Sequence, residues 1–275
     1  MTDLSNVERG ASSSRTESTE LCGSLVRWWR GMPATVFKWA LAIDAIFLAL
    51  YVLSSAFARG SVELVFLLSL EAEGNPPSWW YGSQQLLVAL AFLLLASQLF
   101  ASDERIRRFR SLFLVSGLGF GFISLDEVGE VHEIGSRALV RFKALGAFTE
   151  TVEHSVFHIK QRIHGGGTWI VVYAIIGIAL LFWLVPQIIK AYKVWPKEVG
   201  LVAIGFGIFA FSAAVLQVVG YFTKVGTLRH YVYVFVEQGL KMGGMSIALF
   251  GVLLVLSAGA IRLTEALAGT TSSSV

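Results

Sequence analysis

Residues 111–131 read SLFLVSGLGFGFISLDEVGEV, an apolar run that ends in an acidic segment. The part from Ser111 to Leu125 carries no charge. A helix of roughly 20 apolar residues crosses the ~30 Å hydrocarbon core of a bilayer. Ionisable residues beside such a helix are costly, so by default they mark a functional site. The stretch therefore predicts a membrane-spanning helix that ends in a functional acidic segment.

The composition of the whole chain also indicates a membrane protein. Of its 275 residues, 55% are hydrophobic and 15% are charged, whereas soluble domains carry about 25% charged residues. Six apolar segments are long enough to cross a bilayer. We therefore expect an all-α, polytopic integral membrane protein, a bundle of about six transmembrane helices. The six spans lie near 38–58, 84–101, 111–131, 167–188, 199–222 and 231–258.

The remaining segments are too short to form a separate soluble domain. We expect one transmembrane domain at 31–262, with a disordered tail at 1–30 and a short tail at 263–275. Residues 1–24 are rich in Ser, Thr and Glu, which is typical of disordered segments. The single cysteine, Cys22, lies in the first tail, so no disulfide within the chain is expected.

Basic residues gather in alternate loops. The net charge of +3 is therefore interpreted as a sign of topology, because basic residues accumulate in cytoplasmic loops. We expect both termini in the cytoplasm and no nucleic-acid partner. The three basic groups are Arg27, Arg30 and Lys38; Arg105, Arg107, Arg108 and Arg110; and Lys190, Lys193 and Lys197.

This orientation brings most of the other ionisable groups to the outer face. Asp126 is expected roughly 7 Å below the outer boundary and Glu237 about 8–9 Å deep. Gln217 falls at a similar level. Polar groups on three helices thus share one layer, where a lipid headgroup or a bound ion would meet the protein. All five histidines come out near this face: His132, His154, His158, His164 and His230.

Asp126, Glu130 and Glu133 recur at spacings of four and three, so they share one face of a helix, and Glu127 lies toward one flank of it. His132 lies on the flank of that face. Carboxylate and imidazole are ligands for zinc, iron or manganese, and a carboxylate can also act as a general base. We therefore predict a divalent metal held by Asp126, His132 and Glu133, with Glu127 or Glu237 as the catalytic base.

Structural roles are the alternative for several of these groups. The side chains of Asp126, Glu130 and Glu133 can extend into the headgroup layer from the end of the helix. Glu237 and Lys241, four residues apart with the acid first, suit an ion pair within one helix. Histidines 154–164 lie in a long loop that can simply be solvated. Asp44, on the cytoplasmic side of the first span, has no obvious partner and stays unassigned.

Two spans also carry closely spaced glycines. Small residues let membrane helices approach closely, so we expect both glycine faces to point into the bundle. These residues are Gly117, Gly119 and Gly121 in the third span and Gly239, Gly243 and Gly244 in the sixth.

The motif Ser-Leu-Asp-Glu at 124–127, followed by His132-Glu133, is the most distinctive in the chain. Looser motifs occupy 71–79 and 237–243. Through these motifs, roughly 60–255 resembles an uncharacterised group of bacterial six-helix multi-pass inner-membrane proteins. The resemblance implies a six-helix bundle in the inner (plasma) membrane, and it implies no activity.

The chain departs from that group at Gln238 and Lys241, where similar sequences tend to carry acids. An acid also tends to occur near Gln217. These departures put in doubt whether a metal centre built from several carboxylates is intact here.

Two functions of different classes follow from the pattern. The first is a metal-dependent enzyme acting on a lipid or lipid-linked substrate, where the metal would activate water or polarise a carbonyl or phosphoryl oxygen. The second is a proton- or ion-linked transporter or sensor, because buried acids are also used in proton relays. A structural membrane subunit is a third alternative. Membrane lipid is the expected partner, and a homo-oligomer is compatible with the pattern.

Overall fold

The computed structural model describes residues 4–57, 69–70, 76–129, 167–216, 219, 223 and 227–273. Within these ranges the protein is helical and contains no strand. Six helices are long and apolar enough to cross a membrane. The prediction of an all-α, multi-pass membrane bundle is confirmed.

Six long helices and three short elements make up the described structure. The long helices are α1 (Leu4–Phe57), α3 (Pro76–Ala96), α5 (Arg110–Gly129), α8 (Gly167–Tyr192), α9 (Pro196–Phe211) and α11 (Leu228–Ser273). The short elements are the 3-10 helix η1 (Gln98–Phe100), the helix α4 (Glu104–Arg107) and the π-helix η2 (Ser212–Leu216), which continues α9.

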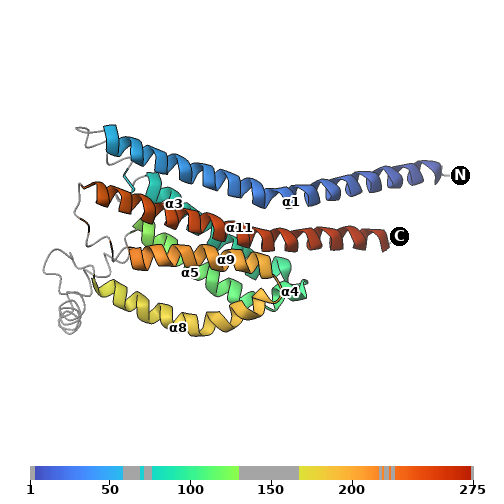
Figure 1. Ribbon diagram of the computed structural model, residues 1–275. Coiled ribbons are helices and arrows are strands. Elements are labelled where there is room, and N and C mark those ends of the chain that lie inside the picture. Colours follow the sequence, from blue (N-terminus) through green and yellow to red (C-terminus); the bar gives the residue numbers. More distant parts are fainter. Residues whose placement is uncertain are drawn as a thin grey trace.

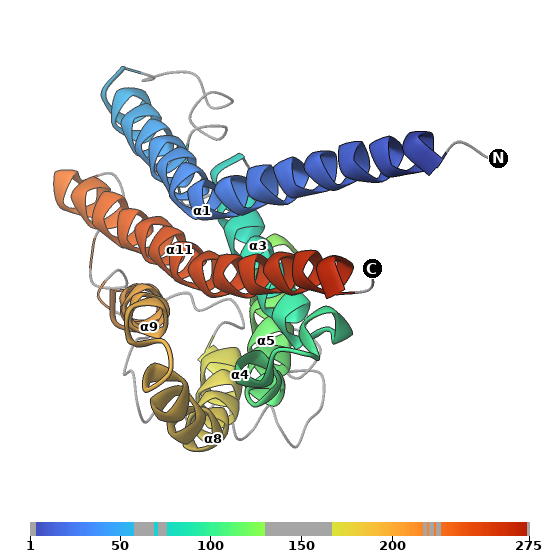
Figure 2. The same ribbon diagram turned by 90° about the vertical axis from the view of Figure 1, so that its right-hand side faces the viewer.

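Helix α11 is the centre of the bundle. It packs against α9, α1 and α3, and α3 packs in turn against α5. Helix α8 lies at the edge of the bundle, beside α9 (Figure 2). In α11, 67% of the apolar segment is buried inside the protein, compared with 6% in α8. Most of the surface of α8 over Ile175–Tyr192 is therefore free to face lipid.

Both termini and α4 lie at the same end of the bundle (Figure 1). The turn between α8 and α9 lies at this end too, because the ring of Trp195 stands 5.5 Å from that of Phe109, next to α4. Arg105 and Lys193, members of two of the basic groups, are exposed here. One end of the bundle thus collects the basic loops, as the charge pattern predicts.

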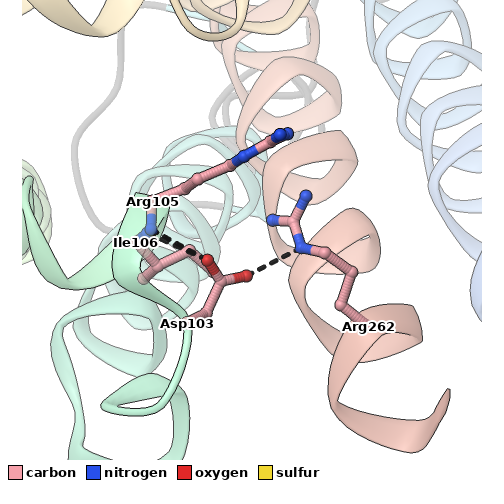
Figure 3. Close-up of polar contacts among 4 residues, drawn as sticks. All are labelled: Asp103, Arg105, Ile106 and Arg262. Carbon is pink, nitrogen blue, oxygen red and sulfur yellow. Dashed lines mark hydrogen bonds and ion pairs between the residues drawn. The ribbon is translucent and has the colours of Figure 1, made fainter. Parts of the chain in front are cut away.

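A polar contact fixes α4 to the far part of α11 (Figure 3). The Asp103 carboxylate accepts hydrogen bonds from the backbone N–H groups of Arg105 and Ile106, at 3.0 and 3.4 Å. It thereby caps the N-terminus of α4, a contribution of about 1 kcal/mol in other helices. Its second oxygen accepts a hydrogen bond from Nε of Arg262 on α11, at 2.7 Å.

The second span begins earlier than predicted. We expected 84–101, but α3 begins at Pro76 and ends at Ala96. Proline is tolerated in the first helical turn because the N–H that it lacks has no partner there. At the other end, Nε of Arg110 donates to the carbonyl oxygen of Ala96 at 2.8 Å, which satisfies a carbonyl that the helix leaves open. The predicted boundaries of this span were wrong.

The first and last helices are longer than predicted. Helix α1 begins at Leu4, inside the stretch expected to be disordered, and α11 continues to Ser273, beyond the expected end of the membrane domain at 262. Extending a helix is much easier than nucleating one. A membrane span therefore acts as a nucleus from which polar flanking residues continue the helix.

Glycines bring the backbones of α9 and α11 into direct contact. A Cβ atom added to Gly244 would lie 2.7 Å from the backbone oxygen of Gly205, and one added to Gly251 would lie 2.8 Å from that of Glu198. Such close approaches of the two backbones are possible because the residues on α11 have no side chain. The two helices therefore form a seam of close backbone contact.

The glycine prediction holds for part of the set. A Cβ on Gly117 would lie 2.8 Å from the side chain of Leu93, so this glycine does face the bundle. Gly119 and Gly243 have open space where a Cβ would stand. The predicted face was wrong for these two and correct for the other four, Gly117, Gly121, Gly239 and Gly244, which lie against neighbouring helices.

Helix α1 bends along its length (Figures 1 and 2), and it contains the buried Pro33. Proline removes the hydrogen bond to the carbonyl four residues earlier, which here belongs to Trp29. That carbonyl oxygen accepts a hydrogen bond from the Ser257 hydroxyl on α11, at 2.6 Å. The bend is thus stabilised by a partner from the last helix.

Replacing Gly244 by Ala is expected to destabilise the bundle, because its Cβ would meet the backbone of Gly205 at 2.7 Å. Overpacking of this kind costs about 1–3 kcal/mol, and a backbone atom moves away only if α9 separates from α11. The Tm of the purified protein in detergent measures the effect. Gly243→Ala is the matched control, and equal Tm values for the two variants would contradict the seam.

Candidate functional site

The last turn of α5 carries two of the predicted site residues, Asp126 and Glu127, both half-buried. This turn lies against the start of α3. The hydroxyl of Ser124 donates to the carbonyl oxygen of Gly82 at 2.8 Å, and a Cβ at Gly82 would overlap the side chain of Val128. Because α3 has no side chain here, the acidic end of α5 approaches it closely.

Tyr81 is the residue at which four helices meet. Its side chain is buried, and its ring stands 5.9 Å from the ring of Phe209 on α9. Its hydroxyl interacts electrostatically with Glu127 on α5 and with Glu237 on α11. Two carboxylates that are far apart in the sequence therefore lie within electrostatic range of one buried hydroxyl.

Glu237 forms an ion pair with Lys241. The Lys241 Nζ lies 2.8 Å from Oε1 of Glu237, and the two side chains are 11% and 8% exposed. The structure confirms the ion pair that the four-residue spacing suggested. In apolar surroundings, removing one member of such a pair leaves a buried charge without compensation. Glu237 and Lys241 therefore depend on each other for their charged state.

Beside this ion pair, α9 leaves regular helical geometry and continues as the π-helix η2. The hydroxyl of Ser212, fully buried, donates to the backbone carbonyl of Glu237 at 2.7 Å. The hydroxyl of Tyr233 on α11 donates to the carbonyl oxygen of Leu216 at 2.7 Å. Short π-helical segments leave backbone groups that need other partners, and they are frequent at functional sites.

The predicted metal site is only partly within the described residues. Asp126 is described, whereas His132 and Glu133 lie outside the described ranges, so their coming together stays a prediction. Within those ranges, no group of three or more His, Cys, Asp or Glu residues is placed to hold a metal. Other predicted participants outside the described residues are Glu130, His154, His158, His164 and Gln217.

His230, the histidine that the structure describes, helps to form the start of α11. Its ring Nδ1 lies 3.0 Å from the hydroxyl of Thr223. Its backbone N–H donates to the hydroxyl of Thr227 at 3.3 Å, which is the geometry of an N-cap. His230 therefore has a structural role, because its contacts with two threonines help to fix the start of α11.

Asp44 is the polar residue that the sequence did not explain. It is 4% exposed, and its carboxylate accepts three hydrogen bonds from two other helices. On Oδ1 the donors are the Trp80 Nε1 at 2.7 Å and the Gln84 Nε2 at 2.9 Å. On Oδ2 the donor is the Ser246 hydroxyl at 2.7 Å. Gln84 also donates to Ser246 at 2.9 Å, which closes the cluster.

The level of Gln84 gives the depth of this cluster. Gln84 lies about 12 Å along α3 from its first residue, and the whole helix of 21 residues spans ~30 Å. Asp44 therefore lies near the middle of the bundle, and its expected position on the cytoplasmic side was wrong. The partners of Asp44 could have been suspected from the polar residues of α3, above all Gln84, because polar residues within an apolar span need partners inside the bundle.

Comparison with known proteins gives a family and no activity. A protein family described as "Domain of unknown function (DUF8692)" matches residues 40–256, which include Asp44, Tyr81, Glu127 and Glu237. No curated protein and no solved structure matches the chain.

The Glu237–Lys241 pair can be tested by a double-mutant cycle. Glu237→Gln and Lys241→Met are each expected to lower the free energy of unfolding by roughly 3–5 kcal/mol, because each leaves a buried charge unpaired. The double variant, which buries no charge, should recover most of this loss. Unfolding in detergent measures the three variants. Losses that simply add in the double variant would contradict the pair.

Proposed function

The chain belongs to the DUF8692 family, a domain of unknown function, and from its own residues we propose that it is a proton-linked membrane transport protein. Its working site is the outer acid site, which we define as Tyr81, Glu127, Glu237 and Lys241. One observation carries the proposal: a buried Glu–Lys pair and a second carboxylate, on two different helices, both act electrostatically on the same buried tyrosine hydroxyl.

The chemistry of the outer acid site suits proton transfer. Ionisable residues inside a membrane bundle are expensive and are the groups that proton relays use. The Tyr81 hydroxyl can both donate and accept a hydrogen bond, so it can link the two carboxylates. Glu127 is half-buried and Glu237 is buried. A proton that enters at the end of α5 would therefore pass from the more accessible acid to the less accessible one.

Protonation of Glu237 would also change its surroundings. A neutral Glu237 no longer compensates the charge of Lys241, which is 11% exposed. The backbone of Glu237 is tied to the π-helix η2 through Ser212. A proton at this acid would thus alter a contact between α11 and the irregular part of α9, where two helical hydrogen-bond patterns already meet.

The proposal includes an orientation and a location. The end that collects both termini and α4 is the cytoplasmic one, because its exposed basic residues follow the rule that cytoplasmic loops are positively charged. The outer acid site then lies in the outer half of a bacterial inner membrane, within the domain expected at 31–262. Lipid covers the exposed face of α8, or a second copy of the chain does in a homo-oligomer.

Proton flux into vesicles tests this function. The purified protein is reconstituted into lipid vesicles that hold a trapped pH-sensitive dye, and an external pH step is applied with the membrane potential clamped by valinomycin and potassium. Wild-type vesicles should relax faster than protein-free vesicles. Glu127→Gln and the double variant Glu237→Gln/Lys241→Met should relax at the protein-free rate.

Glu265→Gln is the control for this assay, because Glu265 is exposed near the end of α11 and should leave the flux unchanged. Wild-type vesicles that relax no faster than protein-free ones would reject the proposal. The same rejection follows if both outer-acid variants conduct protons like the wild type.

A metal-dependent enzyme acting on a lipid or lipid-linked substrate is the second candidate. It is favoured by the position of Asp126 and Glu127, two half-buried acids in the last described turns of α5, shortly before His132 and Glu133 in the sequence. In this alternative Asp126, His132 and Glu133 hold zinc, iron or manganese, and Glu127 or Glu237 is the general base. A metal there would activate water or polarise an oxygen of the substrate.

Metal analysis of the detergent-purified protein tests this second candidate. Stoichiometric zinc, iron or manganese is expected in the wild type, and its loss is expected in both Asp126→Ala and His132→Ala, because each removes one ligand. Circular dichroism checks that both variants stay folded. A wild type that retains no metal after incubation with all three ions would retire the candidate.

A further inference from the structure

Within the part of the chain that the structure describes, the surroundings of Asp44 contain hydrogen-bond donors but no positively charged partner. Its partners among the described residues are Trp80, Gln84 and Ser246, all neutral. A carboxylate buried in apolar surroundings without a cation is very costly when ionised, and such groups are usually neutralised instead. A proton is the smallest ligand that removes this charge.

The other titratable groups near this level are already occupied or lie further along the helices. From α11, Lys241 and Glu237 pair with each other. From α3, the nearest titratable group is Tyr81, three residues before Gln84, and on α1 itself the neighbours are Lys38 and Tyr51. None of them is a hydrogen-bond or ion-pair partner of Asp44 in the part of the chain that the structure describes.

The geometry at Asp44 fits both the ionised and the protonated acid. Oδ2 and the Ser246 hydroxyl lie 2.7 Å apart. When the acid is ionised, Ser246 donates its hydrogen to Oδ2. When Oδ2 carries a proton, the acid donates to Ser246, whose own hydrogen can turn to the backbone carbonyl four residues earlier. Trp80 and Gln84 donate to Oδ1 in both states, so no helix has to move.

Two buried side-chain amides continue the polar path along α3. Gln84 and Gln85 are 0% exposed. Oε1 of Gln84 and both polar atoms of Gln85 make no hydrogen bond with any residue that the structure describes. The Gln85 amide lies near the Tyr81 hydroxyl, one helical turn away on α3, but the two form no hydrogen bond. Buried polar atoms require partners, and internal water commonly supplies them.

These observations join two levels of the bundle. Tyr81 lies within electrostatic range of the carboxylates of the outer acid site, and Gln84 donates a hydrogen bond to Asp44. The two residues are three apart on α3, which is about 4.5 Å along the helix axis. The polar groups of one helix therefore lead from the outer acid site toward the middle of the membrane.

We propose that Asp44 is a second proton-binding site, near the middle of the bundle, which exchanges its proton with the outer acid site along α3. Binding adds one proton to the carboxylate and gives a neutral carboxylic acid that donates to Ser246. The role of Asp44 in transport rests on the proposed function, whereas its protonation is a separate property that is measured without any flux.

Infrared difference spectroscopy of the protein in lipid bilayers tests the proposal. Spectra are taken across the pH range in which the wild type stays folded. A carboxylic-acid C=O stretching band should be present in the wild type and absent from Asp44→Asn, in which a neutral amide of similar shape replaces the acid. Ser246→Ala should keep the band at a shifted frequency, because the acid loses a hydrogen-bond partner.

The matched control is Ser257→Ala, which removes a buried hydroxyl from the same helix at a site that binds Trp29 and not Asp44, and it should leave the band in place. If Asp44→Asn does not fold, the shift in Ser246→Ala against this control still decides the assignment.

The proposal is overturned if Asp44→Asn loses no carboxylic-acid band, or if Ser246→Ala leaves every band where it was. A band that disappears when sodium is added at fixed pH would also overturn it, because Asp44 would then hold a metal cation. If the Asp44 band is present but the protein conducts no protons in vesicles, the transport function is rejected and the protonation of Asp44 is still supported.

Discussion

Polar groups in the apolar interior of this bundle must find their partners within the bundle, and the arrangement of the helices depends on this constraint. Helix α11 supplies most of these partners. Ser257 binds the carbonyl freed by the proline of α1, and Ser246 binds Asp44. On its other side, α11 carries the glycines that admit α9, and with it the π-helix that contacts Glu237. The most buried helix is thus also the one that connects the polar groups of its neighbours.

Two acid sites at different depths result from this arrangement. At the outer site, charge is compensated by charge, since Glu237 has Lys241. At Asp44, neutral donors surround the acid. The first arrangement provides the carboxylate with a countercharge, whereas the second provides it with neutral donors alone among the described residues. Helix α3 faces both sites, because Tyr81 and Gln84 lie on neighbouring turns of the same helix.

The sequence predicts the features that depend on local pattern. Six spans follow from apolar length alone, and the Glu237–Lys241 pair follows from a spacing of four. The start of α3 was misjudged, because the continuous apolar run begins only after Gln85, whereas the helix already begins at Pro76. The partners of Asp44 could not be predicted, since they lie on other helices and depend on which helices are neighbours. The metal ligands His132 and Glu133 lie outside the described residues, so that prediction stands untested.

The hydrogen bond between Ser246 and Asp44 joins residues 202 positions apart. During synthesis, the first helix enters the membrane long before the last one is made. Asp44 therefore has no partner until the helix with Trp80 and Gln84 is inserted, and it gains Ser246 only when the last helix follows. Biogenesis of this protein thus includes an intermediate in which an acid lies in the lipid with few hydrogen-bond partners. Insertion of the final helix supplies the last of these hydrogen bonds to Asp44.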